Sequence, residues 1–246
     1  VSDGMTIFEA YKMLFAPQAA TKGFISIVMV DYGLSDEMTL QSLSALPAST
    51  TFILSPYAEA AQDKIDRARS SGHEVWLNLP VQSKGYGNGN DSGPLTLLSG
   101  LDPEQNNIRL QKTLALAHGY AGVTFSNLPD FRESPDGLKD ILMSLAGRGI
   151  PLSLASVDET ATLSGLAEAS SLPYTQNGLW LDADEGEVAL QSKLAQLELI
   201  ATEKFQAVAF IRPQPKLFSA LKNWGGTLSA KGLEFAPLSA SVPEKK

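Results

Sequence analysis

Short, fully apolar runs recur along the chain and alternate with longer segments that are apolar on one face only. A fully apolar run of a few residues is typical of a strand that is buried on both faces of a sheet. Most of these runs end at a polar or turn-forming residue, as the first one does at Asp31. We expect strands at residues 24–30, 51–54, 75–79, 121–125, 151–154, 179–181, 207–211 and 233–237.

The segments between these runs have helical patterns with recognisable ends. Asp102, Pro103 and Gln105 supply an N-cap, a proline in the first turn and a capping-box partner. Gly72 suits the end of the helix before it, and Asp184 is expected to cap a later helix. We expect helices at residues 35–46, 58–71, 102–118, 134–148, 158–170 and 215–224, and one more after Asp184.

Regular alternation of strands and helices, without a break in composition, predicts one α/β domain with a mainly parallel sheet. In such folds the polar residues that follow the strands gather at one edge of the sheet and carry the chemistry. Periodicity alone does not separate a closed barrel from an open sheet.

Composition narrows the range of partners and of chemistry. The net charge of −8 disfavours nucleic acid and anionic membranes, both of which bind surfaces rich in Lys and Arg. The absence of Cys excludes disulfides and thiol catalysis, and two His are too few for a His-rich metal site. No apolar stretch reaches the roughly 18 residues of a membrane span. The chain begins at Val1 without a signal peptide, so we expect the natural N-terminus to lie upstream.

Three segments resemble a known family. Residues 27–35 and 72–80 are apolar strands that run into polar residues, and residues 90–98 form an Asn-Asp-Ser-Gly-Pro stretch. Together they resemble the divergent polysaccharide deacetylases, a branch of the carbohydrate esterase superfamily. The resemblance implies an irregular seven-stranded (β/α) barrel over residues 23–240, an N-terminal arm over 1–22 and a polar tail over 241–246.

The resemblance also implies a chemistry that this chain departs from. Active members hold a divalent metal such as zinc with one Asp and two His, and use a second Asp as general base. Their first motif is Asp-Asp, with the base followed by a ligand. Here it reads Asp31-Tyr32, so the base position is kept and the ligand position holds a phenol, a poor zinc ligand at neutral pH.

The remaining motifs of the family are also altered. The Gly72-His73-Glu74 start of the second motif is intact, but Asn78 stands at the ligand position. After a matching strand at residues 119–123, Ser126 occupies the position of the second ligand His, and Arg212 replaces a late His. The Asp expected after the strand at 151–154 is absent too. With these positions altered together, we expect no bound metal and no cofactor.

Several of these residues have a structural as well as a functional interpretation. Asp31 is either a surviving base or a polar residue that bonds the turn after its strand. Asp182 is either a pocket carboxylate or structural, and Arg212 either recognises a carboxylate or is neutralised by Asp31. His73 and His118 are interpreted as structural or helix-end residues, and the three Trp as packing residues.

We therefore expect a deacetylase-like domain without metal-dependent chemistry that binds a glycan or a cell-envelope protein. Its mouth would be lined by Asp31, Tyr32, Asn78, Ser126, Asp182 and Arg212. The alternative is a carbohydrate deacetylase whose site is rebuilt around Asp31 and Asp182, and a third possibility is a pure protein-interaction domain. The resemblance implies a periplasmic or cell-envelope location, and the oligomeric state stays open.

Overall fold

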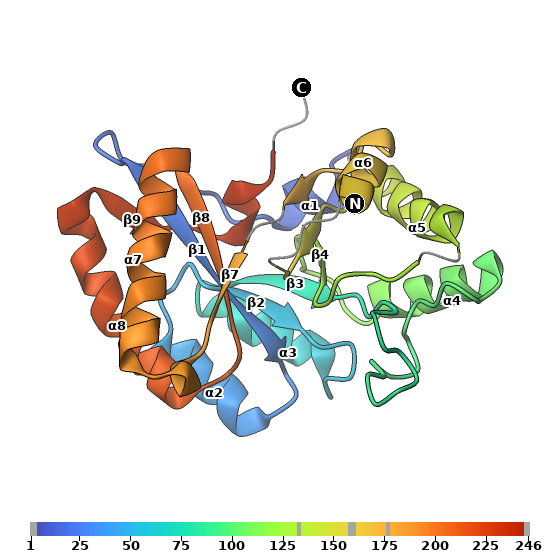
Figure 1. Ribbon diagram of the computed structural model, residues 1–246, viewed down its shortest axis with the longest axis horizontal. Coiled ribbons are helices and arrows are strands. Elements are labelled where there is room, and N and C mark those ends of the chain that lie inside the picture. Colours follow the sequence, from blue (N-terminus) through green and yellow to red (C-terminus); the bar gives the residue numbers. More distant parts are fainter. Residues whose placement is uncertain (1–3, 132–133, 157–160, 176–177, 244–246) are drawn as a thin grey trace.

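The computed structural model describes residues 4–131, 134–156, 161–175 and 178–243. Its central element is a parallel sheet with the strand order β6-β5-β4-β3-β2-β1-β8-β7, and β9 pairs with the start of β1. The sheet curls into half a barrel with helices on its outer side (Figure 1). The strands are β1 (Gly23–Tyr32), β2 (Thr51–Leu54), β3 (Glu74–Asn78), β4 (Val123–Phe125), β5 (Leu152–Leu154), β6 (Tyr174–Thr175), β7 (Gly178–Leu181), β8 (Gln206–Ile211) and β9 (Leu233–Phe235).

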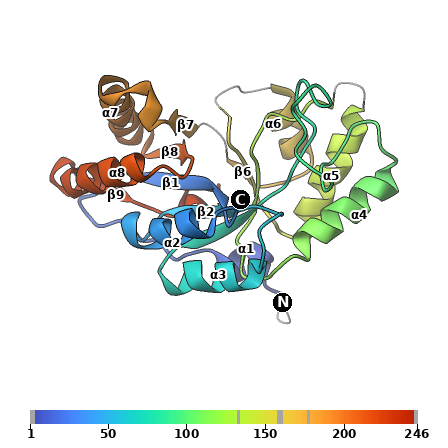
Figure 2. The same cartoon turned by 90° about the horizontal axis from the view of Figure 1, so that it is seen from below.

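The helices lie around the curled sheet in two groups. Figure 2 shows α7 and α8 at one side of the molecule and α4, α5 and α6 at the opposite side. The predicted irregular (β/α) barrel class is confirmed. The hydrogen-bonded sheet ends at β6 on one side and at β7 on the other. The helices are α1 (Ile7–Tyr11), α2 (Asp36–Ala45), α3 (Ala61–Ser70), α4 (Pro103–Leu114), α5 (Pro135–Gly147), α6 (Ala161–Ala169), α7 (Glu187–Lys204) and α8 (Pro215–Leu228), with short 3-10 turns η1 (Ala183–Glu185), η2 (Ser229–Lys231) and η3 (Leu238–Ser241).

Alternation along the strands sorts the apolar residues into an outer and an inner core. On β1, Ile27 and Met29 belong to the large core that packs the sheet against the helices. Val28 and Val30 face the concave side and join a smaller core with Trp76 of β3. Both faces of β1 are therefore apolar along this stretch, as expected for a parallel strand covered on both sides.

Two aromatic rings fill the concave side because glycines stand opposite them. A Cβ atom added at Gly122 would lie 2.5 Å from the Trp76 ring, and one added at Gly178 would lie 2.1 Å from the Phe210 ring. Trp76 is fully buried and Phe210 almost so. This packing makes the middle of the half-barrel solid, so polar chemistry is confined to its two ends.

The end of the concave side at the N-termini of the strands is closed by the N-terminal arm and by η3. Phe8 and Tyr11 of α1 pack on the inner core together with Leu238 and Val242. Glu74, at the start of β3 and fully buried, joins the two segments: its carboxylate accepts from the Met13 amide (3.0 Å) and the Ser239 amide (3.0 Å). Chain ends that are distant in sequence are thus tied to one central strand.

The element predictions are confirmed for all eight expected strands, with shifts at some ends. The helix expected to reach His118 ends at Leu114, and the exposed His118 lies in the following loop. The helix expected to end at residue 224 continues to Leu228. The expected start of the helix at 158–170 falls on residues outside the described part, and its described portion is α6. Neither β6 nor α1 was predicted.

Candidate functional site

The polar residues that follow the strands lie at one end of the half-barrel, here called the mouth. Asp31 belongs to β1, Asn78 ends β3, Ser126 follows β4, and Asp182 and Arg212 follow β7 and β8. All strand pairings between these elements are parallel, so the carboxyl ends of the strands share one edge. Side-chain contacts join Asn78 to Ser126 and Asp31 to Arg212.

A bulge at the end of β1 determines which side chains reach the mouth. Met29 pairs with Phe52 and Tyr32 pairs with Leu54, so three steps on β1 match two on β2. Asp31 takes the left-handed conformation (φ 60°), which is unusual for a residue other than glycine. One extra residue reverses the alternation of faces, and Tyr32 therefore falls on the outer side with Ile27 and Met29.

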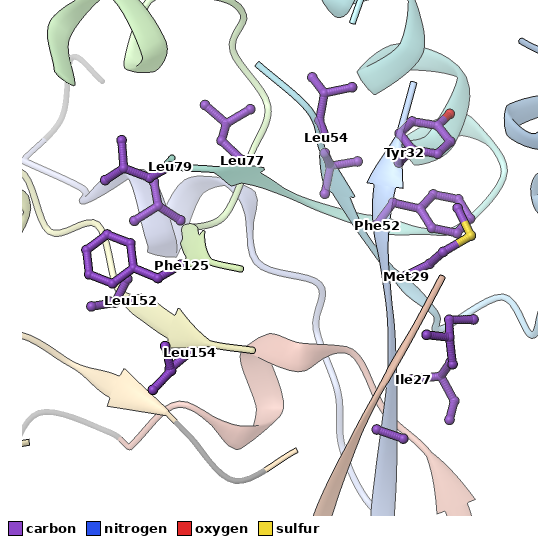
Figure 3. Close-up of a cluster of buried hydrophobic side chains, with 14 of the residues drawn as sticks. Ile27, Met29, Tyr32, Phe52, Leu54, Leu77, Leu79, Phe125, Leu152 and Leu154 are labelled. Atoms are coloured by element: carbon purple, nitrogen blue, oxygen red, sulfur yellow. The ribbon is translucent and has the colours of Figure 1, made fainter. Parts of the chain in front are cut away.

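Tyr32 consequently does not line the mouth, and that prediction is wrong. Its ring is buried and stacked on Phe52 with 4.6 Å between centroids, and its hydroxyl donates to the Lys64 carbonyl at 3.1 Å. Figure 3 shows Tyr32, Phe52 and Met29 together in the core. Burial raises the pKa of Tyr32 to about 12, so the phenol stays protonated at neutral pH. The sequence prediction placed Tyr32 at the mouth because it occupies the ligand position of the family's first motif, and the bulge moves that position to the outer face.

Asn78 and Ser126 lie together in the mouth. The Ser126 hydroxyl donates to Asn78 Oδ1 at 2.8 Å, and both side chains are partly buried. This bond occupies the amide oxygen, which is the better of the two amide atoms for a cation. These two positions, at which the resemblance places imidazole ligands, therefore satisfy each other.

Asp31 and Arg212 face each other on the neighbouring strands β1 and β8. Arg212 Nε lies 4.0 Å from Asp31 Oδ2, and the two side chains are 64% and 45% exposed. Burial raises the pKa of Asp31, and the Arg212 charge partly opposes this shift. The guanidinium lies over the Trp180 ring, 4.8 Å from its centroid. The structure thus adds Trp180 to the mouth, where the sequence suggested only a packing residue.

Asp182 is held in a local polar network. Its carboxylate accepts from the Asp184 amide (2.9 Å) and from Gln214 Nε2 (2.9 Å), and these bonds lower the pKa of Asp182. It caps the 3-10 turn η1, so the prediction that Asp184 caps the following helix is wrong; the cap position of α7 is Gly186. The structural interpretation of Asp182 accounts for both of its bonds.

The donor atoms of the mouth do not fit a zinc ion. In the described part of the chain, no three His, Asp or Glu side chains are grouped so as to hold a metal. The mouth offers one amide oxygen already engaged, one hydroxyl, and a carboxylate beside a guanidinium. Zinc sites use imidazole, thiolate and free carboxylate ligands. Beside Asp31, the positive charge of Arg212 further opposes a dication.

His73 is buried and remote from the mouth, at the entry to β3. Its Nδ1 lies 3.1 Å from the Thr50 carbonyl and its Nε2 lies 3.3 Å from the Leu43 carbonyl. The ring also packs on Phe52 at 4.4 Å. The structural interpretation of His73 is confirmed.

Comparison with solved structures defines the class of the fold. An uncharacterized protein of Agrobacterium tumefaciens C58 is similar at a TM-score of 0.87 and 27% identity, covering 98% of this chain and 96% of the other. A family 4 carbohydrate esterase from Streptomyces lividans in complex with acetate is similar at 0.51 and 14%, covering 90% and 97%. A CE4 family pseudoenzyme from Bacillus anthracis is similar at 0.50 and 14%, covering 92% and 67%. The fold is therefore that of the carbohydrate esterases.

A family model narrows this class. The model of the divergent polysaccharide deacetylases matches residues 27–242, which is most of the chain, so the protein belongs to that family. No curated protein matches the sequence. None of the described helices is both long enough and apolar enough to cross a membrane.

Proposed function

We propose that this protein is a non-catalytic member of the divergent polysaccharide deacetylase family that binds a glycan at its mouth. The observation that carries the proposal is the 2.8 Å bond between Ser126 and Asn78 at the two expected ligand positions. These neutral groups bond to each other, and the third expected ligand position, Tyr32, faces the core. A metal-dependent hydrolase needs the opposite arrangement, in which anionic or imidazole donors converge with free lone pairs.

The polar groups of the mouth suit a carbohydrate. Sugar hydroxyls both donate and accept, and the mouth presents the Asp31 carboxylate, the Arg212 guanidinium and the Asn78 and Ser126 side chains. One solved structure of similar fold, the Bacillus anthracis protein, is described as a pseudoenzyme, and a mutant of it is described as having restored enzymatic activity. We propose that the partner is a cell-envelope glycan and that the protein acts in the envelope or periplasm.

The test combines metal, activity and binding. We expect no stoichiometric zinc in equilibrium dialysis, no acetate release from acetylated chito-oligosaccharides, and measurable binding of those oligosaccharides by calorimetry. Asp31→Ala should weaken that binding, whereas Asp63→Ala, an exposed acid on α3, should not. Zinc bound one to one at the mouth, or no binding of any envelope glycan, would refute the proposal.

A second candidate function is a carbohydrate deacetylase with a rebuilt site. Its supporting observation is a divergence of two pKa values near Arg212: burial raises the pKa of Asp31, while hydrogen bonds lower that of Asp182. Carboxyl groups separated in this way are typical of acid–base pairs. Acetate release that Asp31→Asn and Asp182→Asn each abolish, with unfolding stability unchanged, would establish this function in place of the first.

A further inference from the structure

The guanidinium of Arg212 is held in place without using its hydrogen-bond donors. It lies over the Trp180 ring at 4.8 Å, and its only ionic contact among the described residues is the 4.0 Å approach to Asp31. That distance is too long for a hydrogen bond, and no other side chain of the described residues accepts from Arg212. With 64% of the side chain exposed, its planar set of five donors is accessible to a ligand.

Trp180 is fixed, so it gives the guanidinium a defined position. Its indole Nε1 donates to the Ala155 carbonyl at 3.1 Å, which joins β7 to the end of β5. Its own carbonyl accepts from Lys193 at 2.8 Å, and its ring packs against Phe210 at 5.7 Å. An arginine stacked on an immobile ring loses less side-chain entropy on binding than a free one.

Asp31 does not neutralise Arg212 effectively. An exposed ion pair at this separation contributes at most about 1 kcal/mol, and water competes for both partners. Among the described residues, the Asp31 carboxylate accepts no hydrogen bond either, and its one charged neighbour is Arg212. Asp182, the other acid in this region, is already engaged by Asp184 and Gln214.

The mouth therefore holds the Arg212 guanidinium and the Asp31 carboxylate 4.0 Å apart, and both are available to a ligand. We propose that Arg212, supported by Trp180, binds the carboxylate of an acidic sugar of the hexuronic acid class, while Asp31 accepts from a neighbouring hydroxyl. The planar guanidinium matches a carboxylate through two parallel hydrogen bonds. The proposal rests on the proposed glycan-binding function and names the ligand class of the same site.

The experiment compares an acid with its uncharged form. Trigalacturonate and its fully methyl-esterified counterpart are titrated into the intact protein by calorimetry at low and at 0.5 M salt. We expect the acid to bind roughly 10- to 150-fold more tightly than the ester at low salt, because one charge-assisted bidentate contact is worth on the order of 1.5–3 kcal/mol. The preference should shrink at high salt.

Variants separate this contact from general effects on folding. Arg212→Gln should abolish the preference for the acid, and Arg212→Lys should keep only part of it, because a lysine lacks the planar pair of donors. Arg67→Gln, which removes an exposed arginine on α3, should leave the preference intact.

Two results overturn the inference. If the acid and the ester bind equally, the inference fails while the proposed glycan-binding function stands. If neither uronate probe binds but acetylated chito-oligosaccharides do, the ligand class is wrong and the function again stands. If no glycan binds, both the inference and the proposed glycan-binding function are refuted.

Discussion

Replacing Glu74 by Gln should release the N-terminal arm while leaving most of the domain folded. The fully buried carboxylate accepts on both of its oxygens. Among the described residues, Oε2 accepts only from the Met13 amide (3.0 Å), whereas Oε1 accepts from Trp76 Nε1 (2.8 Å), the Ser239 amide (3.0 Å) and the Thr51 hydroxyl (3.4 Å). In the variant, the amide oxygen can take the Oε1 position and keep its partners. The amide nitrogen then meets the Met13 amide, donor against donor.

The size of the effect follows from that one lost contact. A buried donor left without its acceptor costs about 1–3 kcal/mol, which corresponds to roughly five- to 150-fold more frequent opening of the arm. The change in global stability should be smaller, because burial raises the pKa of Glu74 and the neutral Gln no longer carries a desolvated charge.

The pH dependence gives a second measurement. The pKa of Glu74 is raised above its ordinary value of 4.5, so the folded state takes up a proton at a higher pH than the unfolded state. The native protein should therefore gain stability as pH falls through the folded pKa toward 4.5, and this gain is lost as pH rises again. Glu74→Gln lacks this component.

Native-state hydrogen exchange at the Met13 amide, followed with urea unfolding between pH 4.5 and 7, measures both effects. Glu37→Gln, which alters an exposed acid on α2, serves as the matched control and should change neither. Unchanged exchange in the arm, together with an unchanged pH profile, would refute the assignment of Glu74 as the residue that holds the arm.

Three further predictions concern the core. Gly122→Ala places a Cβ 2.5 Å from the Trp76 ring and should lower the free energy of unfolding by about 1–3 kcal/mol; urea midpoints within error of the native value contradict it. Tyr32→Phe removes the bond to the Lys64 carbonyl and should lower the free energy of unfolding by about 0.5–1.5 kcal/mol without changing glycan binding. Weaker glycan binding in calorimetry would show instead that Tyr32 contacts the ligand. Burial lowers the pKa of His73 below 6.5, so stability should fall as pH drops through 6.5 and level off below the folded pKa; His73→Gln should flatten this slope in thermal unfolding.

The strands could be predicted because parallel strands covered on both faces are continuously apolar, and each such run appears in the sequence. Asn78, Ser126 and Arg212 were singled out because they occupy motif positions of the family that the chain resembles. The side of the sheet on which Tyr32 lies could not be predicted, because the bulge at Asp31 reverses the two faces. The bulge places Asp31 in the left-handed conformation, and the sequence has no glycine at that position to indicate it. A single extra residue moves a side chain from the mouth to the core.

Glu74 and Trp180 were missed as organising residues for a different reason. Each acts through contacts with segments far away in sequence: Glu74 with Met13 and Ser239, and Trp180 with the Ala155 carbonyl and Arg212. The local sequence shows only that Glu74 follows a turn and that Trp180 lies within a strand. Neither position indicates which distant residue will be its partner in the folded chain. Such long-range contacts become visible only when the chain is folded.

The residues at the expected metal-ligand positions depend on one another. The loss of a single ligand therefore does not describe how this site differs from a metal site. Tyr32 contributes to the core, Asn78 and Ser126 bond to each other, and a guanidinium with free donors stands beside Asp31, the position at which the base is kept. Restoring an imidazole at Asn78 alone would disturb the bond to Ser126 and still leave a positive charge beside Asp31. The same guanidinium that disfavours a metal ion favours a carboxylate, so the arrangement that argues against the hydrolase also argues for an acidic ligand.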